Sequence, residues 1–307
     1  MSPLQAALDD YVRVRRALGF GLAREGRLLP DFVALLERHG HATITVPLAL
    51  RWALAPPGAS PRWAQTRLAM VRGFARYLAA HDPRTEVPDP AWLPTPRTTR
   101  RTPYLYTDAE VRALIQAART LQGLKGATYA TLIGLLAATG MRVGEALALE
   151  RGDVDDHDPV LVIRHGKFGK ARELPLHPTT TAALRAYAHE RDRVWPQPRS
   201  PHFLLSRAGT RLRYQNVQGT FQRLVSRAPL TGPRPPRPRL HDLRHTFAVT
   251  TLVRWYRAGV DVEVRLPALS TYLGHVAPSS TYWYLTATPE LLQLAHHRAH
   301  RVREARP

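Results

Sequence analysis

A proline-rich segment in the first third of the chain constrains its fold more than any other feature. Residues 82–103, DPRTEVPDPAWLPTPRTTRRTP, contain six prolines and four arginines. Each proline ring restricts φ and removes a backbone donor, so this density prevents a continuous helix and favours an extended, semi-rigid linker. We therefore expect two domains, residues 1–81 before the linker and residues 104–307 after it.

The charge balance favours a polyanionic partner. The chain has 44 Lys plus Arg against 24 Asp plus Glu, a formal net charge of +20. Nucleic acid is the first candidate for an excess of this size, and a charge that serves solubility alone is the alternative. The absence of cysteine excludes disulfides, thiolate metal sites and a cysteine nucleophile. No segment resembles a signal peptide or reaches transmembrane length, so we predict a soluble, cytoplasmic protein without a membrane partner.

Residues 1–81 have the periodicity of a helical bundle. Apolar positions recur at helical spacing before a stop at Gly40, and Ser60-Pro61 has the form of a cap and first turn for the last helix. That helix and the linker supply the candidate DNA-contacting arginines Arg62, Arg67, Arg72, Arg76, Arg100 and Arg101. An ordinary solvated helix face explains the helical part of this pattern equally well.

The second domain is predicted to be mainly helical with one small antiparallel sheet. Thr107-Asp-Ala-Glu110 has the form of a capping box ahead of an apolar helix. Residues 159–164 and 171–176 are predicted as short strands, joined by the glycine-bearing hairpin loop 165–170. Further helices are predicted on both sides of a turn at Gly140 and at residues 179–193, 216–227, 241–256 and from Pro267 onward.

Two helical segments bring cationic side chains together. In LHDLRHT, the residues His241, Arg244 and His245 fall at i, i+3 and i+4 and share one helix face. In ATGMRVGEAL, Arg142 follows a glycine turn between apolar helices, and Glu145 is placed to pair with it. Both arrangements suit an anion site. The alternatives are an ordinary surface helix for the first and a buried packing pair for the second.

Lysine and tyrosine supply groups that can exchange a proton. The chain has only three lysines, and two of them, Lys167 and Lys170, lie in the hairpin loop. An ammonium can release its proton whereas a guanidinium stays charged, so we predict a general acid at Lys167 and chance placement in a turn for Lys170. His275 follows a glycine turn, and Tyr284 comes nine residues later.

The stretch SSTYWYLT contains two tyrosines, Tyr282 and Tyr284. Two positions on a helix that are two residues apart point in nearly opposite directions, so only one of these phenols can face a shared anion site. Their spacing alone leaves the choice between them open.

Together these segments resemble a known family. ATGMRVGEAL, the Lys167 hairpin, HDLRHTFA, LGH and the late tyrosine occur in the order and spacing of the tyrosine recombinases, the phage integrase family, over roughly residues 103–295. The resemblance implies a two-domain recombinase with an N-terminal helical core-binding domain, similar in size and position, and a C-terminal DNA breaking-rejoining domain. The segment 254–267 is longer than is usual in the family. The ending YWYLTATPELLQLA is similar to transposon-associated integrases.

The resemblance also implies the roles of individual residues. Tyr284 is then the nucleophile, with Tyr282 as the fallback, and Glu145 and His245 support the site. The implied active-site set is Arg142, Lys167, His241, Arg244 and His275. In this scheme the two arginines bind the nonbridging phosphate oxygens, His241 assists the tyrosine, His275 hydrogen-bonds to the phosphate, and Lys167 protonates the leaving 5′-oxygen.

The function implied is site-specific recombination or integration through a covalent 3′-phosphotyrosine, with no metal, no ATP and no cofactor. The implied partners are double-stranded DNA and about three further copies of the chain in a tetramer. The C-terminal segment docks either on its own domain or on a neighbour. A type IB topoisomerase and a non-catalytic DNA-binding protein on the same scaffold are the alternatives. A metal-dependent nuclease is disfavoured because no HExxH-type pair accompanies the 14 histidines.

Overall fold

The computed structural model describes residues 2–93, 102–155, 158–164, 171–230, 237–275, 279–286 and 288–304. The chain separates into two compact units, residues 1–100 and 101–307. Within the described residues the chain is mainly helical with one two-stranded antiparallel sheet, which confirms the fold class predicted from the sequence. The limits assigned to the linker, residues 82–103, stay a prediction.

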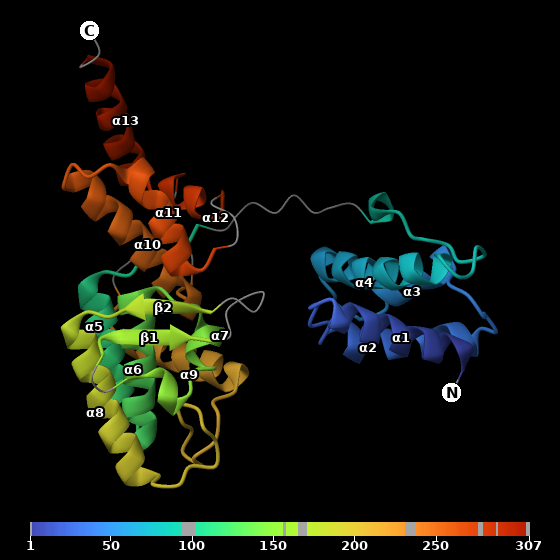
Figure 1. The fold of residues 1–307 in the computed structure, drawn as a ribbon, viewed down its shortest axis with the longest axis horizontal. Helices are drawn as coiled ribbons and strands as arrows, with labels where there is room; N and C mark the ends of the chain where they lie inside the picture. Colours follow the sequence, from blue (N-terminus) through green and yellow to red (C-terminus); the bar gives the residue numbers. More distant parts are fainter. Residues whose placement is uncertain are drawn as a thin grey trace. The chain divides into compact units, whose positions relative to one another are not determined.

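Unit 1 is a helical bundle. Its described helices are α1 (Pro3–Ala17), α2 (Glu25–Arg38), α3 (Val46–Leu54) and α4 (Pro61–Ala79), followed by the short turn η1 (Pro90–Trp92). The helix pairs α1/α2 and α3/α4 pack against each other (Figure 1). Ser60 caps α4, because its hydroxyl accepts the Trp63 N–H at 3.3 Å. The apolar faces meet in a core that contains the fully buried Phe32 and Phe74.

Unit 2 is built around α6 (Leu124–Thr139). This helix packs against α5 (Asp108–Arg119), α8 (Pro178–Val194) and α10 (Leu240–Arg257). It is apolar on nearly every face, as expected for a helix enclosed by others. The predicted capping box is present at the start of α5: the Thr107 hydroxyl accepts the Glu110 N–H at 3.2 Å, and the Glu110 carboxylate accepts the Thr107 N–H at 2.9 Å.

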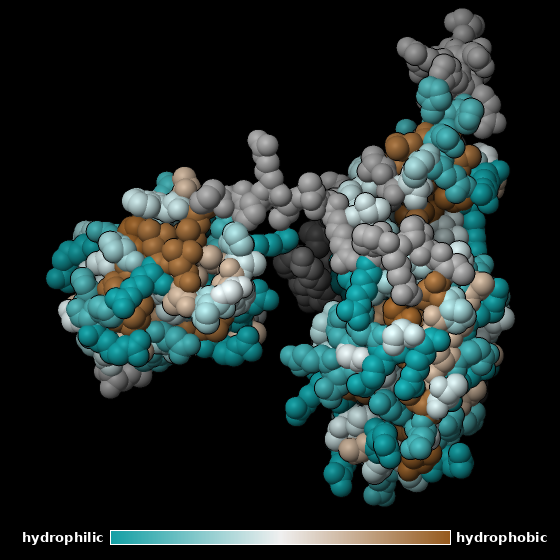
Figure 2. Space-filling view, turned by 180° about the vertical axis from the view of Figure 1, so that it is seen from behind, coloured by the Kyte–Doolittle hydropathy of each residue, from teal (hydrophilic) through white to brown (hydrophobic). Residues whose placement is uncertain are grey.

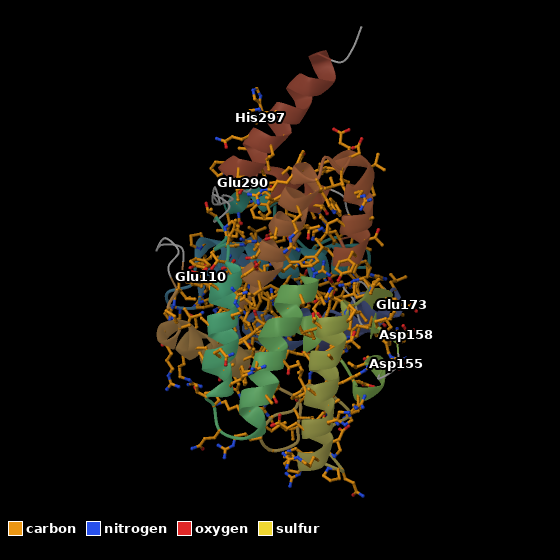
Figure 3. The ribbon with its side chains drawn as sticks, turned by 90° about the vertical axis from the view of Figure 1, so that its left-hand side faces the viewer. Glu110, Asp155, Asp158, Glu173, Glu290 and His297 are labelled. Atoms are coloured by element: carbon orange, nitrogen blue, oxygen red, sulfur yellow. The ribbon has the colours of Figure 1, made fainter. Side chains whose placement is uncertain are left out.

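The sheet consists of β1 (Val160–Ile163) and β2 (Arg172–Pro175), paired antiparallel with Leu161 opposite Leu174. Successive side chains of a strand point to opposite faces. Arg172 therefore shares the inner face with the buried Leu174, while Glu173 is exposed and lies on the outside of the molecule (Figure 3). The loop that joins the strands lies outside the described residues.

The remaining described elements of unit 2 are, in chain order, α7 (Val143–Ala146), η2 (Arg151–Asp153), α9 (Tyr214–Arg227), α11 (Val262–Leu273), α12 (Ser279–Tyr282), η4 (Trp283–Thr286) and α13 (Pro289–Glu304). Helix α11 begins five residues before the predicted start at Pro267. The Asp261 carboxylate accepts the Glu263 N–H at 3.0 Å and caps the helix there, so the proline lies inside it.

The first turn of α13 packs on its own unit. Leu291 is fully buried, and Arg257 of α10 donates to the Glu290 carboxylate at 2.5 Å. Figure 3 shows Glu290 near the start of α13 and His297 farther along it. This first turn therefore contacts its own unit, and docking of the C-terminal segment on the same domain or on a neighbour stays a prediction.

Hydrophilic side chains cover most of the face seen in Figure 2, and hydrophobic patches interrupt them on both units. Among the described residues, no helix combines the length and the apolar character that a membrane crossing requires.

Candidate active site

The first part of the site is the turn that ends α6. Gly140 has φ +61°, a left-handed conformation that ends the helix and that glycine adopts most readily. A Cβ at this position would lie 2.5 Å from the Phe247 ring, so the turn is also tightly packed against α10. This turn offers the Gly140 carbonyl as a hydrogen-bond acceptor, and Arg142 follows the glycine by two residues.

Arg142 is held by a carboxylate that it shares with a second arginine. The Nη1 atom of Arg142 donates to Glu145 Oε1 at 2.8 Å, and its backbone N–H donates to Oε2 at 2.9 Å. Arg172 donates to the same two oxygens at 3.2 and 2.8 Å. Burial would raise the pKa of Glu145, but the hydrogen bonds from the two arginines outweigh it and lower this pKa.

Arg244 is the most deeply buried cation of the site, with 2% of its surface exposed. Its Nη1 donates to the Gly140 carbonyl and its Nη2 to the Leu273 carbonyl, both at 2.9 Å. Burial lowers the pKa of Arg244 to about 10, while its electrostatic interaction with the neighbouring Tyr284 opposes this shift. The guanidinium remains charged near neutral pH and is fixed between two chain segments.

His275 follows a second left-handed glycine, Gly274, which has φ +68°. The His275 backbone N–H donates to the Ser270 carbonyl at 2.9 Å, and its ring Nδ1 lies 2.6 Å from the Thr281 hydroxyl. Burial lowers the pKa of His275 to about 4, and the charges of nearby arginines add to this shift. The imidazole is therefore neutral at neutral pH.

Tyr284 lies against these groups with 3% of its surface exposed. Its ring stacks on the His275 ring with 6.1 Å between centroids and an 18° interplanar angle, and the His245 ring lies 5.5 Å away. Trp283 packs beside it at 5.3 Å. Tyr282, by contrast, is 55% exposed. The two phenols thus point in different directions, and Tyr284 is the one near Arg244.

His241 lies at the solvent-facing side of the cluster. It is exposed, and its ring is 4.8 Å from that of His245, one turn farther along α10. Desolvation by the surrounding protein lowers the pKa of His241, and the charge of Arg244 lowers it further. A neutral imidazole at this place can accept a proton.

The structure therefore brings together Arg142, Glu145, His241, Arg244, His245, His275 and Tyr284 of the predicted set. Lys167, and the linker residues Arg100 and Arg101, lie outside the described residues.

The arginines of α4 do not form one exposed face. Arg62 and Arg76 are exposed and Arg72 is partly exposed, but Arg67 is buried. The Arg67 guanidinium donates twice to the Trp52 carbonyl, at 3.1 and 2.8 Å, and stacks on the Trp52 ring. A residue five positions after Arg62 lies about 140° around the helix, which explains why Arg67 points into the bundle and leaves the candidate DNA-contacting set.

Sequence reasoning missed two residues of the cluster. Arg172 had a usable signal, because strand alternation puts it on the same face as the apolar Leu174. Thr281 had only a weak sequence signal, which is its position one helical turn before Tyr284. Among the described residues, no group of three or more His, Cys, Asp or Glu is placed to hold a metal ion.

Comparisons with known proteins agree on one family. The model of the phage integrase family matches residues 105–290. The chain is 45% identical to the integrase/recombinase y4rB of Sinorhizobium fredii over the full length of both chains. It is 32% identical to the tyrosine recombinase XerD of Caulobacter vibrioides, covering 100% of this chain and 98% of that one.

A solved structure shares the fold at low sequence identity. The Tn1549 transposon integrase in complex with transposon right end DNA superposes with a TM-score of 0.62, at 19% identity, covering 98% of this chain and 99% of that one. The similarity extends across both units.

Proposed function

This chain belongs to the phage integrase family and is a site-specific tyrosine recombinase, and from that premise we propose that it cleaves and rejoins duplex DNA through a covalent 3′-phosphotyrosine at Tyr284. The observation that carries the proposal is the convergence of Tyr284, Arg244 and His275 from three different segments of unit 2. The DNA complex of the structurally similar Tn1549 integrase and the net charge of +20 support DNA as the partner.

In the proposed cleavage step, the Tyr284 oxygen attacks a backbone phosphorus, a P–O bond to tyrosine forms, and the P–O5′ bond breaks. Negative charge develops on the nonbridging oxygens during this step. The guanidiniums of Arg142 and Arg244 can stabilise that charge because their contacts already fix their orientation. Neither arginine needs to reorganise as the charge develops.

Two proton transfers accompany the exchange of bonds. A phenol has an ordinary pKa of about 10, so the attacking oxygen must lose a proton. His241 can accept it, because its lowered pKa keeps the ring neutral at neutral pH. The leaving 5′-oxygen gains a proton, and we assign that role to Lys167. His275, also neutral, hydrogen-bonds to the phosphate.

The covalent intermediate retains the energy of the phosphodiester bond. A 5′-hydroxyl from another strand can therefore reverse the step without ATP, which exchanges strands, whereas attack by the original strand only reseals the nick. Exchange between two duplexes needs two cuts in each, so we propose a tetramer on DNA. The relation to the Tn1549 transposon integrase supports the movement of a mobile element as the biological role.

The decisive experiment is capture of the covalent adduct on a nicked suicide substrate in the presence of EDTA. The wild-type chain should form the adduct, and Tyr284→Phe should form none while binding the same DNA. Tyr282→Phe is the matched control, because it removes a neighbouring exposed phenol and should react like the wild type. An adduct in Tyr284→Phe, or its loss with EDTA, contradicts the proposal. A strand-exchange assay and a plasmid-relaxation assay, run on the same protein, distinguish recombination from topoisomerase activity.

A further inference from the structure

Arg172 has no role in the chemistry described above, yet it is one of the most constrained side chains near the site. It has only 12% of its side chain exposed and makes three hydrogen bonds to two separate segments. Two go to Glu145 in α7. The third goes from Nε to the Tyr272 carbonyl at 2.9 Å, near the end of α11.

Arg172 saturates the carboxylate that Arg142 also uses. Glu145 Oε1 accepts from both guanidiniums, and Oε2 accepts from Arg172 Nη2 and from the Arg142 backbone. Arg142 therefore binds this carboxylate through a single side-chain nitrogen. A lone arginine beside a carboxylate prefers the two-pronged, bidentate pair. Occupation of both oxygens by Arg172 prevents that pair.

The second Arg142 nitrogen is consequently directed elsewhere. Its Nη2 donates to the Gly274 carbonyl at 2.8 Å, next to His275. Both guanidiniums also lie close against Gly274: a Cβ there would be 2.7 Å from Arg172 Nη1 and 3.3 Å from Arg142 Nη1. The two arginines and the glycine turn thus pack against one another.

Arg172 also sets the local charge. Glu145 alone would cancel the charge of Arg142, leaving that arginine less able to attract a phosphate. With Arg172 added, the group of two arginines and one carboxylate carries a net charge of +1. The same residue begins β2.

We propose that Arg172 is a positioning residue of the recombinase, which holds Arg142 in the phosphate-binding orientation by occupying Glu145 and bonding to the turn before His275. This inference rests on the proposed function and deepens it. In this proposal the reaction requires Arg172, although Arg172 does not itself contact the DNA phosphate.

The test compares adduct formation by the full chain at saturating DNA, so that the rate reports the chemical step. Arg172→Met keeps much of the side-chain volume and removes the charge and every donor. We expect adduct formation to slow by about 100-fold, the order of loss that a 1 Å misplacement can cause. Arg164→Met is the matched control. Arg164 directly follows β1 and also pairs with a buried carboxylate, that of Asp153, and the variant should react within about threefold of wild type.

Arg172→Lys is a second variant that tests the proposal if Arg172→Met fails to fold. It keeps the positive charge, but one ammonium cannot reproduce the planar two-oxygen contact together with the Tyr272 bond. We expect at least a roughly tenfold loss with an unchanged unfolding midpoint. A rate equal to that of wild type in this variant overturns the positioning role.

A crystal structure of Arg172→Met, or of Arg172→Lys if the first does not fold, supplies the readout that a purely structural role would not change. Arg142 should turn to a bidentate pair with Glu145 and lose its contact with the Gly274 carbonyl. An unmoved Arg142 overturns the inference. If the wild-type chain forms no adduct at all, the proposed function fails first; if it reacts and Arg172→Met matches it, only this inference fails.

Discussion

The Nδ1 atom of His275 lies 2.6 Å from the hydroxyl oxygen of Thr281, and this contact ties the Gly274 turn to the segment that carries Tyr284. Thr281 is fully buried and precedes the tyrosine by three residues, one helical turn. One hydrogen bond therefore positions both the imidazole and the phenol that stacks on it.

Thr281→Val should slow covalent adduct formation by about fivefold, since one hydrogen bond contributes on the order of 1 kcal/mol and about 1.4 kcal/mol corresponds to tenfold in rate. Valine is nearly isosteric but cannot bond to the ring nitrogen. Thr281→Ser keeps the hydroxyl and is the control. Equal rates for the valine and serine variants would show that the contact does not position His275.

The lowered pKa of His275 predicts how stability changes with pH. The folded value is about 4 against an ordinary value of 6.5, so between these limits the unfolded chain binds more protons. This contribution is complete above pH 6.5 and is lost as the pH falls toward 4. The charged groups that face the ring are Arg244, Arg142, Arg172 and Glu145.

Denaturant unfolding measured between pH 4 and 7 checks that prediction. The free energy of unfolding should rise with pH across the window in the wild type and rise less steeply in His275→Gln. Asp and Glu titrations contribute equally to both proteins, so the difference between the two curves isolates the histidine. Identical curves would contradict the burial of a neutral imidazole.

Substituting each of the two lysines of the hairpin loop tests whether Lys167 is a general acid and whether Lys170 lies there by chance. Lys167→Ala should slow cleavage by roughly 100-fold or more, within the usual range for loss of a general acid, and Lys170→Ala should change it little. A substrate with a 5′-bridging sulfur provides the sharper readout. Because a thiolate leaves without protonation, this substrate should restore the Lys167→Ala rate. No restoration would assign the proton to another group.

The exposed and buried arginines of α4 should behave differently. Replacing Arg62 and Arg76 by Met should weaken DNA binding and reduce the slope of log affinity against log salt by about 2, as expected for two lost phosphate contacts. Arg67→Met should leave that slope unchanged and lower the free energy of unfolding by about 1–3 kcal/mol, because the Trp52 carbonyl loses its donors. An unchanged slope in the double variant would restore the solvated-face interpretation.

Much of the fold was predictable because its signals are local. The capping box at Thr107, the proline start of α4 and the alternation of β1 and β2 each depend on neighbours within a few residues. The start of α11 was mispredicted because Pro267 is a strong local signal for a first turn, whereas the actual start depends on the Asp261 cap. Helical periodicity also could not show that Arg67 points into the bundle.

The sequence by itself determined the helical class, the cationic character and the identity of the candidate groups, since composition and short spacings carry that information. The spacing of Tyr282 and Tyr284 left open which one faces the arginines, a choice that only the family resemblance made, and nothing in the sequence showed how those arginines are held. Tertiary structure decided both: Tyr284 lies beside Arg244, and Arg172 meets Arg142 at Glu145, across separations of 40 and 30 residues. Such contacts depend on how distant segments pack, and no local pattern encodes them.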